Sequence, residues 1–461
     1  MPHLPGQMRR LLICTQPNLT RPKRRDMQNA GKLTIADYVD SYYSRTLRND
    51  NARAPIDTDI SVDVCIVGAG MAGITAALAL LGRGRTVALL EAKRVSWGAS
   101  GRNGGVVSPG YSTGVSNIAQ HVGMDEAKAL YRMSIEGVDI VRENIRRLNI
   151  DEAGPVNGVL RLSRHENASE MMAHQQWLSR EFGYEVKYLS TAEVRERVVS
   201  DKYRQGLLDE NAFHFHPLNY ARALVSEVER LGGRVFELSE VVSIKDQGTS
   251  KRVTTAHGSV TARDVVLTCG GYTGSLVPRL ARSYLPISTY MMLTEPAKNV
   301  IASAIRTCAS IGDSRRSSDY YRLVDDGERV LWGGMITTRR SDPHRLADAL
   351  RNRMVDTYPQ LKDLAVQVAW SGKMAYARHL MPLIGRLEDG IWYCMGFGGH
   401  GMNTTAIGGR VIAEGITGTS NRYQSFAALG LPWNGSYVGL AVAQLTYWSY
   451  QMMDFMRERA A

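Results

Sequence analysis

Cysteine is scarce in this chain, with five residues among 461. They are scattered, odd in number and without a C-x-x-C pair, at Cys14, Cys65, Cys269, Cys308 and Cys394. This pattern argues against a disulfide framework and against a structural zinc site, since both need suitably spaced cysteines. We therefore expect no metal, a reducing compartment and a cytoplasmic location.

Long hydrophobic runs are also missing. No segment reaches the roughly 18–20 consecutive apolar residues of a membrane span. The nearest, VGLAVAQLTYWSYQMM over residues 438–453, is interrupted by Gln444, Thr446, Ser449 and Gln451. We interpret it as a helix packed on the body of the protein, with a helix lying on a membrane surface as the alternative. Stable membrane insertion is not expected.

Acidic residues are rare at the N-terminus, where residues 1–26 contain several arginines and one lysine but only one acid, Asp26. This segment is similar to a mitochondrial transit peptide in charge, but it is not rich in serine. We favour a tail. The chain carries a net charge of +11, and the rest of it is only mildly basic, which fits an ordinary solvated surface or an acidic small substrate. No nucleic-acid partner is predicted.

Glycine, by contrast, is abundant, with 44 residues. The apolar run Val64–Val67 is typical of a buried parallel strand and ends in GAGMAG. A helix is expected next, because Ile74, Leu78 and Leu81 recur at helical spacing. The strand TVALLEA follows, so the region forms one βαβ unit.

The first glycines of this unit have the spacing G-x-G-x-x-G, at Gly68, Gly70 and Gly73. In a Rossmann-like unit the first makes the tight turn, the second lets a pyrophosphate approach, and the third lets the helix pack on the strand. Glu91 ends the next strand, where a carboxylate binds ribose hydroxyls and repels a 2′-phosphate. The motif therefore predicts FAD or NAD rather than NADP.

A second glycine-rich loop, VSWGASGRNGG, follows at residues 95–105. NAD would need no second loop there, whereas the ribityl chain and flavin of the longer FAD need more closely approaching backbone. Four glycines permit that approach: Gly98, Gly101, Gly104 and Gly105. We expect Arg102 to face phosphate and Asn103 to bond to ring or ribityl groups.

Segments with the strand–helix pattern of nucleotide-binding domains alternate with strand-rich segments along the chain. We therefore predict an α/β protein with a discontinuous Rossmann-like FAD-binding domain and an inserted, antiparallel-sheet α+β substrate domain. The FAD-binding domain is expected at residues 61–150, 215–285 and 375–425, and the substrate domain at 151–214 and 286–374. Residues 1–60 are expected to form a tail and linker, and residues 426–461 a C-terminal helical tail.

Several segments carry a resemblance to a known family. GASGRNGG (98–105), DYYRLVDDGERVLWGG (319–334) and GFGGHGM (396–402) resemble the FAD-dependent amine and amino-acid oxidoreductases of the D-amino-acid-oxidase superfamily, and are particularly similar to the γ-glutamylputrescine oxidoreductases. The likeness runs from about Tyr42 to the end of the chain.

The resemblance implies three groups of FAD-binding residues. The ADP half would be held by Gly68, Gly70, Met71, Ala72, Gly73, Glu91 and Ala92. The path from pyrophosphate to flavin would be lined by Ser100, Arg102, Asn103, Gly104 and Gly105. The flavin pyrimidine edge would meet Gly398, Gly399, His400, Gly401 and Met402, where fixed N–H dipoles stabilise the charge of reduced flavin.

Substrate-binding residues are less sharply indicated. The family places Tyr320, Tyr321 and Arg322 beside the flavin, with ordinary sheet packing as the alternative. Lys373 stands where amino-acid oxidases of the superfamily carry an arginine for the α-carboxylate, which argues against a simple α-amino acid. No catalytic side chain is predicted, because the flavin carries the chemistry.

The histidines and cysteines also bear on this site, as possible metal ligands and as possible points of covalent flavin attachment. His214 and His216 alternate on a strand, but they lack a third metal ligand and are expected to be structural or pocket-lining. Cys308 and Cys394 match no motif for a covalent flavin link, so FAD is expected to be non-covalent.

The resemblance also implies the reaction. A neutral amine would pass a hydride to flavin N5, the imine would hydrolyse to an aldehyde, and O₂ or another acceptor would reoxidise the flavin, with O₂ giving H₂O₂. The expected substrate is γ-glutamylputrescine or a similar secondary or N-substituted amine. The alternatives are an amino-acid or sarcosine-type oxidase, a quinone-linked dehydrogenase and, less favoured, a tRNA-modifying flavoprotein. The oligomeric state is not predicted.

Overall fold

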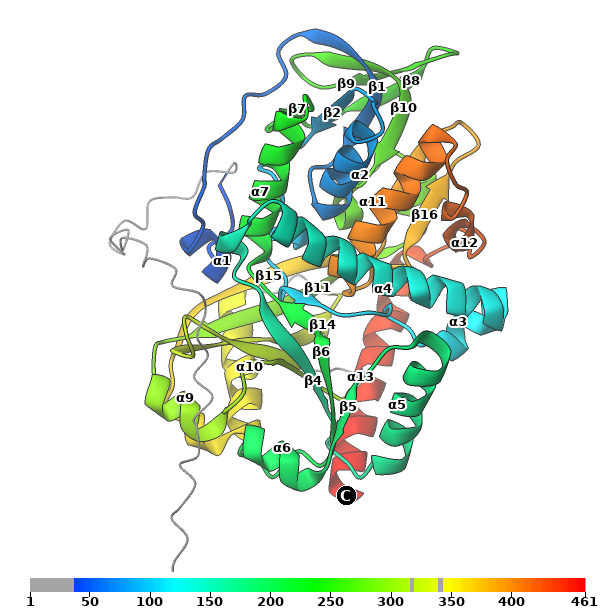
Figure 1. Cartoon of the computed structure of the whole chain (residues 1–461). Helices are drawn as coiled ribbons and strands as arrows, with labels where there is room; N and C mark the ends of the chain where they lie inside the picture. Colours follow the sequence, from blue (N-terminus) through cyan, green and yellow to red (C-terminus); the bar gives the residue numbers. More distant parts are fainter. Residues whose placement is uncertain (1–36, 316–318, 339–342, 461) are drawn as a thin grey trace, which may run out of the picture.

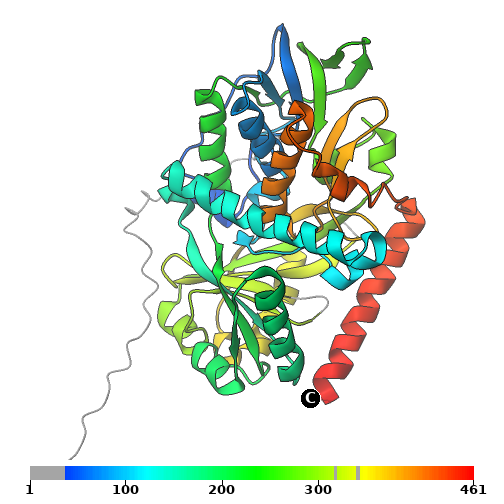
Figure 2. The ribbon, with the colours of Figure 1, turned by 45° about the vertical axis from the view of Figure 1, so that its right-hand side comes forward.

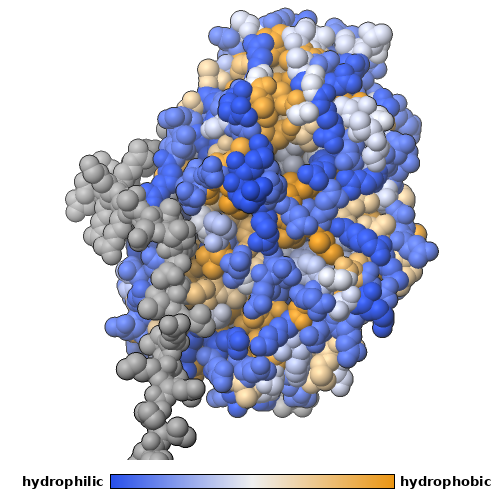
Figure 3. All heavy atoms as spheres, viewed as in Figure 1, coloured by the Kyte–Doolittle hydropathy of each residue, from blue (hydrophilic) through white to orange (hydrophobic). Residues whose placement is uncertain are grey.

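Two β-sheets organise the chain (Figure 1). The computed structural model describes residues 37–315, 319–338 and 343–460. Within them, one sheet has eight strands and the other has nine. Hydrophilic side chains cover much of the face shown in Figure 3, with apolar patches scattered between them.

The eight-stranded sheet has the order β16-β17-β10-β1-β2-β7, with β9 paired to β10 and β8 paired to β9. Its centre is parallel, because β1 pairs in parallel with both β2 and β10. Cys65 and Ile66 of β1 are fully buried, which confirms the predicted buried strand. The strands are β1 (Asp59–Val67), β2 (Val87–Leu90), β7 (Arg234–Phe236), β8 (Ser243–Asp246), β9 (Lys251–Thr254), β10 (Ser259–Leu267), β16 (Leu383–Arg386) and β17 (Trp392–Met395).

Helices cover one face of this sheet. Its main layer is α2 (Met71–Leu81), α7 (Pro217–Arg230) and α11 (Gly401–Thr417), and α4 (Met124–Arg147) crosses α11 (Figure 1). Alternate residues of β1 point to opposite faces, so Val64 and Ile66 join the core under the helices while Cys65 and Val67 join a second core. The smaller helices of this half are α3 (Val115–Val122), α8 (Pro278–Ala281) and α12 (Tyr423–Ala427).

The nine-stranded sheet has the order β15-β11-β14-β13-β12-β4-β6-β3, with β5 paired to β6. All its pairs are antiparallel except that of β12 with β4. The strands are β3 (Val106–Val107), β4 (Val156–Leu162), β5 (Lys187–Leu189), β6 (Gly206–His214), β11 (Leu285–Thr294), β12 (Ser310–Asp313), β13 (Tyr320–Val324), β14 (Arg329–Thr337) and β15 (Val366–Tyr376).

The second sheet has its own helices and its own core. The helices around it are α5 (Ala168–Phe182), α6 (Thr191–Arg197), α9 (Lys298–Ala304) and α10 (Pro343–Thr357). Aromatic rings fill the core, and Tyr321 stacks on Trp332 with ring centroids 4.0 Å apart. The described residues also form short 3₁₀ helices: η1 (Ala99–Gly101), η2 (Asp151–Ala153), η3 (Gly270–Tyr272) and η4 (Pro359–Leu361).

The predicted fold class is confirmed, since a parallel-centred sheet is joined to a mainly antiparallel one. The division into domains at the stated residue numbers stays a prediction. Within the predicted tail and linker, helix α1 (Tyr42–Arg45) packs on the body and buries Tyr43 completely. Residues 1–36 of the predicted tail, including Asp26, lie outside the described residues.

The C-terminal helix α13 (Ser436–Ala460) runs beside the second sheet and extends past it (Figure 2). Its polar side faces the protein: Gln444 is 8% exposed, whereas its neighbour Leu445 is 60% exposed. The prediction that this apolar helix packs on the body is therefore correct for the helix but wrong for its apolar side. No helix in the described part of the chain meets the length and hydropathy that crossing a bilayer requires.

The cysteines differ in their state. Cys65, Cys269 and Cys394 are free, and Cys308 is disulfide-bonded. The bond at Cys308 was not predicted, although the expectation concerned a disulfide framework rather than a single bond. Spacing along the sequence could not reveal it, because a disulfide depends on which cysteines the fold brings within a few ångströms.

Candidate cofactor and substrate site

One cavity of about 2000 Å³ joins the two sheets. It begins at the ends of β1 and β2, passes the loop at residues 96–104, and reaches the face of the nine-stranded sheet. Pockets for small ligands usually measure about 300–1000 Å³. The size therefore suits a long ligand in two parts together with a substrate.

The first glycine loop has the geometry that the motif predicts. Gly68 has φ +104°, a conformation that side chains rarely adopt. A Cβ on Gly73 would overlap the carbonyl oxygen of Gly68 and lie 2.8 Å from Thr268 Oγ1. The tight turn and the close approach of α2 to the strand are thus confirmed as physical requirements of this backbone.

The N-terminus of α2 opens onto the cavity. Its N-cap is Gly70, which supplies no side-chain hydrogen bond to the first amides of the helix. Ser100 Oγ accepts from the amide of Met71 at 3.0 Å and so connects the two glycine loops. Unpaired amides and the helix dipole make this position suitable for a pyrophosphate.

Glu91 lies just after β2, on the cavity wall. Its Oε2 accepts from the amide of Ala69 at 2.9 Å, and its Oε1 accepts from the amide of Lys93 at 3.0 Å. Burial raises the pKa of this carboxyl group, and these two bonds oppose the shift. The carboxyl group is therefore held in place and keeps acceptor sites toward the cavity, as a ribose requires.

The second glycine loop is shaped mainly by the protein itself. A Cβ on Gly101 would overlap the carbonyl oxygen of Ser96, and one on Gly105 would overlap that of Phe215. Neither glycine lines the cavity, whereas Gly98 and Gly104 do. Approach of a cofactor therefore stays a prediction for Gly98 and Gly104, while Gly101 and Gly105 are required by backbone packing.

The polar side chains of this loop form hydrogen bonds to the backbone of the same loop. Arg102 Nε donates to the carbonyls of Trp97 and Gly98, at 3.0 and 3.2 Å. Asn103 Nδ2 donates to the carbonyls of Ala99 and Ser100. We expected them to face phosphate and ribityl groups, but their donors bond to backbone carbonyls of this loop and, from Arg102 Nη1, to that of Ser371. Both residues still line the cavity, and they fix its wall.

The late loop at residues 396–402 forms the opposite wall. Gly398 and Gly399 have positive φ values of +58° and +82°. His400 Nε2 bonds to the carbonyls of Ser108 and Pro109, at 3.2 and 3.3 Å. Burial lowers the pKa of His400 to about 4, so the ring is neutral and donates to one of these carbonyls. Its side chain therefore holds the loop, and α11 begins at the next residue.

The predicted substrate residues separate into two groups. Tyr320 lines the cavity, while Tyr321 points into the core and bonds to the hydroxyls of Tyr203 and Tyr358. Arg322 is also turned away, and its Nε donates to the carbonyl of Gly104 at 2.9 Å. The structure thus brings only Tyr320 of this trio into the cavity. Arg322 instead bonds to the glycine-rich loop on the side that faces away from the cavity.

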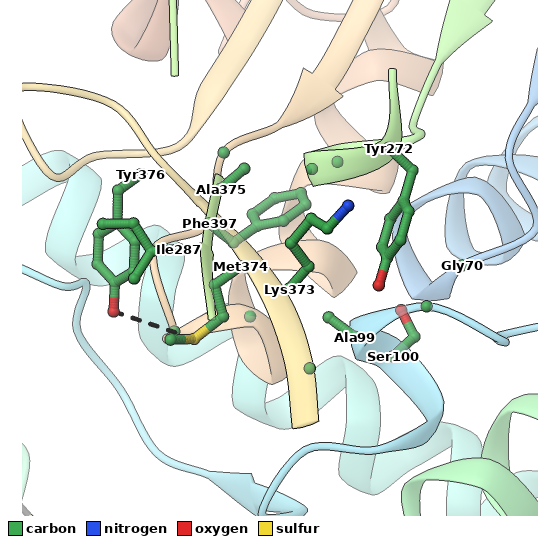
Figure 4. Close-up of a pocket in the computed structure, with 18 of the residues that line it drawn as sticks. Gly70, Ala99, Ser100, Tyr272, Ile287, Lys373, Met374, Ala375, Tyr376 and Phe397 are labelled. Carbon is green, nitrogen blue, oxygen red and sulfur yellow. Dashed lines mark hydrogen bonds between the residues drawn. The ribbon is translucent and has the colours of Figure 1, made fainter. Parts of the chain in front are cut away.

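Lys373 lies on β15 at the cavity wall, with its Nζ 4.6 Å from the centre of the Tyr272 ring. Figure 4 shows these two side chains facing each other, across from the loop that carries Ala99 and Ser100. Tyr272 was missed from the sequence. The only signal was the glycine pair at the end of its strand, which does not show that the next residue faces a cavity.

His214 and His216 are structural, as expected. His214 Nε2 bonds to the carbonyl of Cys308, and His216 Nδ1 accepts from the amide of Asn219 at the start of α7. Burial lowers the pKa of each ring to about 3. The described residues contain no group of three or more potential metal ligands.

Two further parts of the cavity wall were not predicted. Arg161 projects from β4, in a part of the predicted substrate domain where no site residue was expected. Helix α13 contributes Val438, Val442, Thr446 and Tyr450. Of the predicted residues, the cavity is lined by Gly68, Gly70, Met71, Ala72, Glu91, Ala92, Ser100, Arg102, Asn103, Gly104, Tyr320, Lys373, Gly398, Gly399, His400, Gly401 and Met402.

Known proteins of similar sequence cover nearly the whole chain. Gamma-glutamylputrescine oxidoreductase of Escherichia coli is 35% identical over 400 residues, 86% of this chain and 93% of that protein. A probable oxidoreductase, OrdL, of Haemophilus influenzae is 31% identical over 433 residues, 91% of this chain and 98% of that protein.

Solved structures show the same fold. Glycine oxidase of Bacillus cereus matches with a TM-score of 0.65 at 21% identity, covering 79% of this chain and 97% of that one. L-proline dehydrogenase of P. horikoshii matches with a TM-score of 0.68 at 18% identity, covering 80% and 98%. At these identities the likeness concerns the fold alone.

The family is established by a match over residues 63–415 to the family described as FAD dependent oxidoreductase. The donor set fits that cofactor, since the open amides of α2, the Glu91 carboxylate and the late glycine loop share one continuous cavity. The chain therefore belongs to the D-amino-acid-oxidase family of FAD-dependent oxidoreductases, enzymes that oxidise carbon–nitrogen bonds of amine and amino-acid substrates.

Proposed function

We propose that this enzyme oxidises γ-glutamylputrescine or a closely similar N-acylated amine, with non-covalent FAD and with O₂ as the electron acceptor. The carbon next to the terminal amine loses a hydride and the amine nitrogen loses a proton, and water then hydrolyses the imine to an aldehyde and ammonia. O₂ is reduced to H₂O₂. We also propose a cytoplasmic location.

The observation that carries the proposal is the length of the cavity. It continues from the glycine loops onto the nine-stranded sheet, past Tyr320 and Gly312 to Arg161. An extended amine can place its reacting carbon beside the glycine loops and lay its other end on the sheet. The likeness to gamma-glutamylputrescine oxidoreductase over 86% of the chain supports such a substrate.

A simple α-amino acid fits this wall less well. Lys373 stands on β15 where arginine is expected in the amino-acid oxidases, and its ammonium group lies over the Tyr272 ring. A lysine donates from a single point, whereas an arginine binds a carboxylate through two parallel hydrogen bonds. The preferred substrate is therefore one whose carboxylate does not bind at Lys373.

FAD would be held by the α2 amides and Glu91 at its ADP half and by the two later loops at its flavin. When bound, it supplies the two-electron acceptor for oxidation of the C–N bond. The chain's own residues orient the substrate and exclude water. Tyr320 contributes a neutral hydroxyl group, because burial raises the pKa of Tyr320 to about 12.

The free cysteines support non-covalent binding. Cys65 and Cys394 are fully buried in strands and do not line the cavity. Cys269 does line it, but its Sγ donates to the carbonyl of Val67, and burial raises its pKa to about 12. A protonated thiol is a poor nucleophile. We expect acid precipitation of the purified protein to release all of the FAD into the supernatant.

The test of function is anaerobic mixing of the yellow holoenzyme with an amine panel while the flavin absorbance near ~450 nm is followed. We expect γ-glutamylputrescine to bleach the band faster than putrescine, sarcosine or glycine. Bleaching by sarcosine or glycine alone would contradict the proposal. In air, one H₂O₂ per substrate oxidised is expected.

A second candidate is a dehydrogenase that passes its electrons to a lipid-soluble quinone. The outward apolar side of α13 favours it, because this helix also lines the cavity through Val438 and Val442. Peroxide yield separates the two candidates. A low yield in air, with rapid turnover on a short-chain quinone, would favour the dehydrogenase.

A further inference from the structure

Three residues form one row across the nine-stranded sheet. Gly312 of β12 pairs with Tyr320 of β13 on one side and with Arg161 of β4 on the other. Residues paired directly across neighbouring strands project from the same face of a sheet. All three line the cavity, so this face is the one that the substrate meets.

The middle of the row is open. A Cβ built on Gly312 would meet no atom within 4 Å. The Tyr320 ring leans the other way, over Gly333 of β14, where a Cβ would overlap it. A shallow channel therefore crosses the sheet at Gly312, with Tyr320 at one end and Arg161 at the other.

The Tyr320 end of the channel is the cofactor end. A Cβ on Gly104 would lie 2.9 Å from the Tyr320 ring, so this ring touches the predicted flavin loop. Arg161 is two strands away, which is roughly 10 Å at the usual strand spacing. The channel thus leads from the reacting position to a guanidinium group.

The Arg161 side chain differs from those of Arg102 and Arg322, which donate to backbone carbonyls. Arg161 and Arg378 are the arginines of the cavity wall whose side chains make no hydrogen bond or ion pair with any residue that the structure describes, and of these two Arg161 lies in the row with Gly312. Its charge nevertheless acts in the cavity, since it contributes to lowering the pKa of His400. Five N–H donors are therefore available to a ligand.

The charged residues of the described cavity wall also favour a carboxylate near Arg161. Its acidic residues are Glu91 and Glu240, which follow β2 and β7 at the ADP end. Arg161, Lys373 and Arg378 are all basic. An amine with a carboxylate at its far end therefore finds Arg161, while the neighbouring Asp209 carboxyl group already accepts from the Tyr184 hydroxyl and from the amides of Asn211 and Ala212.

We propose, resting on the function proposed above, that Arg161 binds the carboxylate of a substrate whose reacting amine carbon lies about nine bonds away. A γ-glutamyl group on a four-carbon diamine has this length, and its extended chain spans ~11 Å. Arg161 thereby selects carboxylated amines over the free diamine and holds them across Gly312.

The test combines two substrates with matched variants of the holoenzyme. R161Q should raise KM for γ-glutamylputrescine about 10- to 100-fold, the usual effect of losing a charge-assisted hydrogen bond, with kcat changed less than about threefold. R161K should recover part of the loss. The control R195Q, at an exposed arginine of α6, should match the wild type.

A substrate analogue tests the same contact without any variant. The α-carboxamide of γ-glutamylputrescine should show the raised KM on the wild-type enzyme, and R161Q should not raise it further. Binding is measured separately with γ-glutamylbutylamide, which keeps the carboxylate but has no reacting amine. Its Kd, from the perturbed flavin spectrum, should rise in R161Q by the same factor as KM.

The outcomes separate this inference from the proposed function. If γ-glutamylputrescine bleaches the wild-type flavin but R161Q binds γ-glutamylbutylamide as tightly as the wild type, the role of Arg161 is wrong and the function stands. If K373Q shows the loss expected of R161Q, the carboxylate binds at Lys373 instead and the inference fails. If the wild type is not bleached, both proposals fail.

Discussion

The ring of Tyr320 lies against the α-carbon of Gly104, so that a methyl group at residue 104 would come within 2.9 Å of the ring. This contact joins the glycine-rich loop that begins after the first βαβ unit to a strand more than two hundred residues further along the chain. The second glycine-rich loop and the nine-stranded sheet are therefore fitted closely to each other at this contact.

This contact predicts the effect of G104A. The added methyl group pushes the loop and the ring apart, and such overpacking usually costs about 1–3 kcal/mol. We expect a lower Tm and a FAD dissociation constant raised about tenfold or more, measured by flavin fluorescence. G114A is the control, because a Cβ there meets no atom within 4 Å. Unchanged FAD affinity in G104A would contradict the predicted place of the flavin.

A second prediction compares two glycines of helix α2. G73A should destabilise the protein by roughly 3 kcal/mol or more, because its Cβ overlaps the Gly68 carbonyl and forces the helix off the strand. Gly82 ends the same helix in an ordinary helical conformation. G82A should therefore leave the free energy of unfolding unchanged or raise it by up to about 1 kcal/mol. Chemical unfolding of both variants, with the FAD content of each, checks the difference.

The buried His400 predicts how stability changes with pH. Its folded pKa is about 4 against an ordinary value of 6.5, so between these values the unfolded chain binds the proton and the folded chain does not. The free energy of unfolding therefore falls as pH falls through this window. H400Q should make the fall shallower by about 1.4 kcal/mol per pH unit.

Urea unfolding of the wild type and H400Q between pH 4 and 6.5 measures this slope. H257Q, at an exposed histidine, serves as the control and should keep the wild-type slope. Equal slopes in the wild type and H400Q would mean that the imidazole is not buried as described.

Helix α13 turns its polar side toward the protein and its apolar side outward, so substitutions at neighbouring residues on these two sides should have different effects. Gln444 Oε1 accepts from the amide and the hydroxyl of Thr338, at 3.0 and 3.2 Å. Q444A should lose these bonds at a cost of about 1–3 kcal/mol and speed hydrogen exchange along the helix. L445Q, on the exposed side, should leave the exchange unchanged. Faster exchange in L445Q would show that the apolar side has a partner in solution.

Local features of the site could be predicted from the sequence. The tight turn at Gly68 and the packing of Gly73 follow from neighbouring residues in one βαβ unit. The position of Glu91 follows likewise, because the ends of adjacent parallel strands meet at one edge. These inferences needed only short spacings along the chain.

Features that depend on distant partners could not be predicted. Arg102 was expected to face phosphate, but the folded loop offers it nearby carbonyls, and its Nη1 also reaches the carbonyl of Ser371. Arg161 gave no signal at all, since alternation on a strand does not say which face meets a cavity. Only the pairing of β4 with β12 placed it opposite Gly312.

The sequence by itself determined the cofactor class and the two-sheet fold, because glycine spacing and apolar periodicity are local constraints on the backbone. The tertiary structure alone decided which side chains remain available to a substrate. The side chains of Tyr321 and Arg322 are buried and form hydrogen bonds within the protein, so their polar groups do not face a substrate. Arg161 kept its donors, because its side chain makes no hydrogen bond or ion pair with any residue that the structure describes.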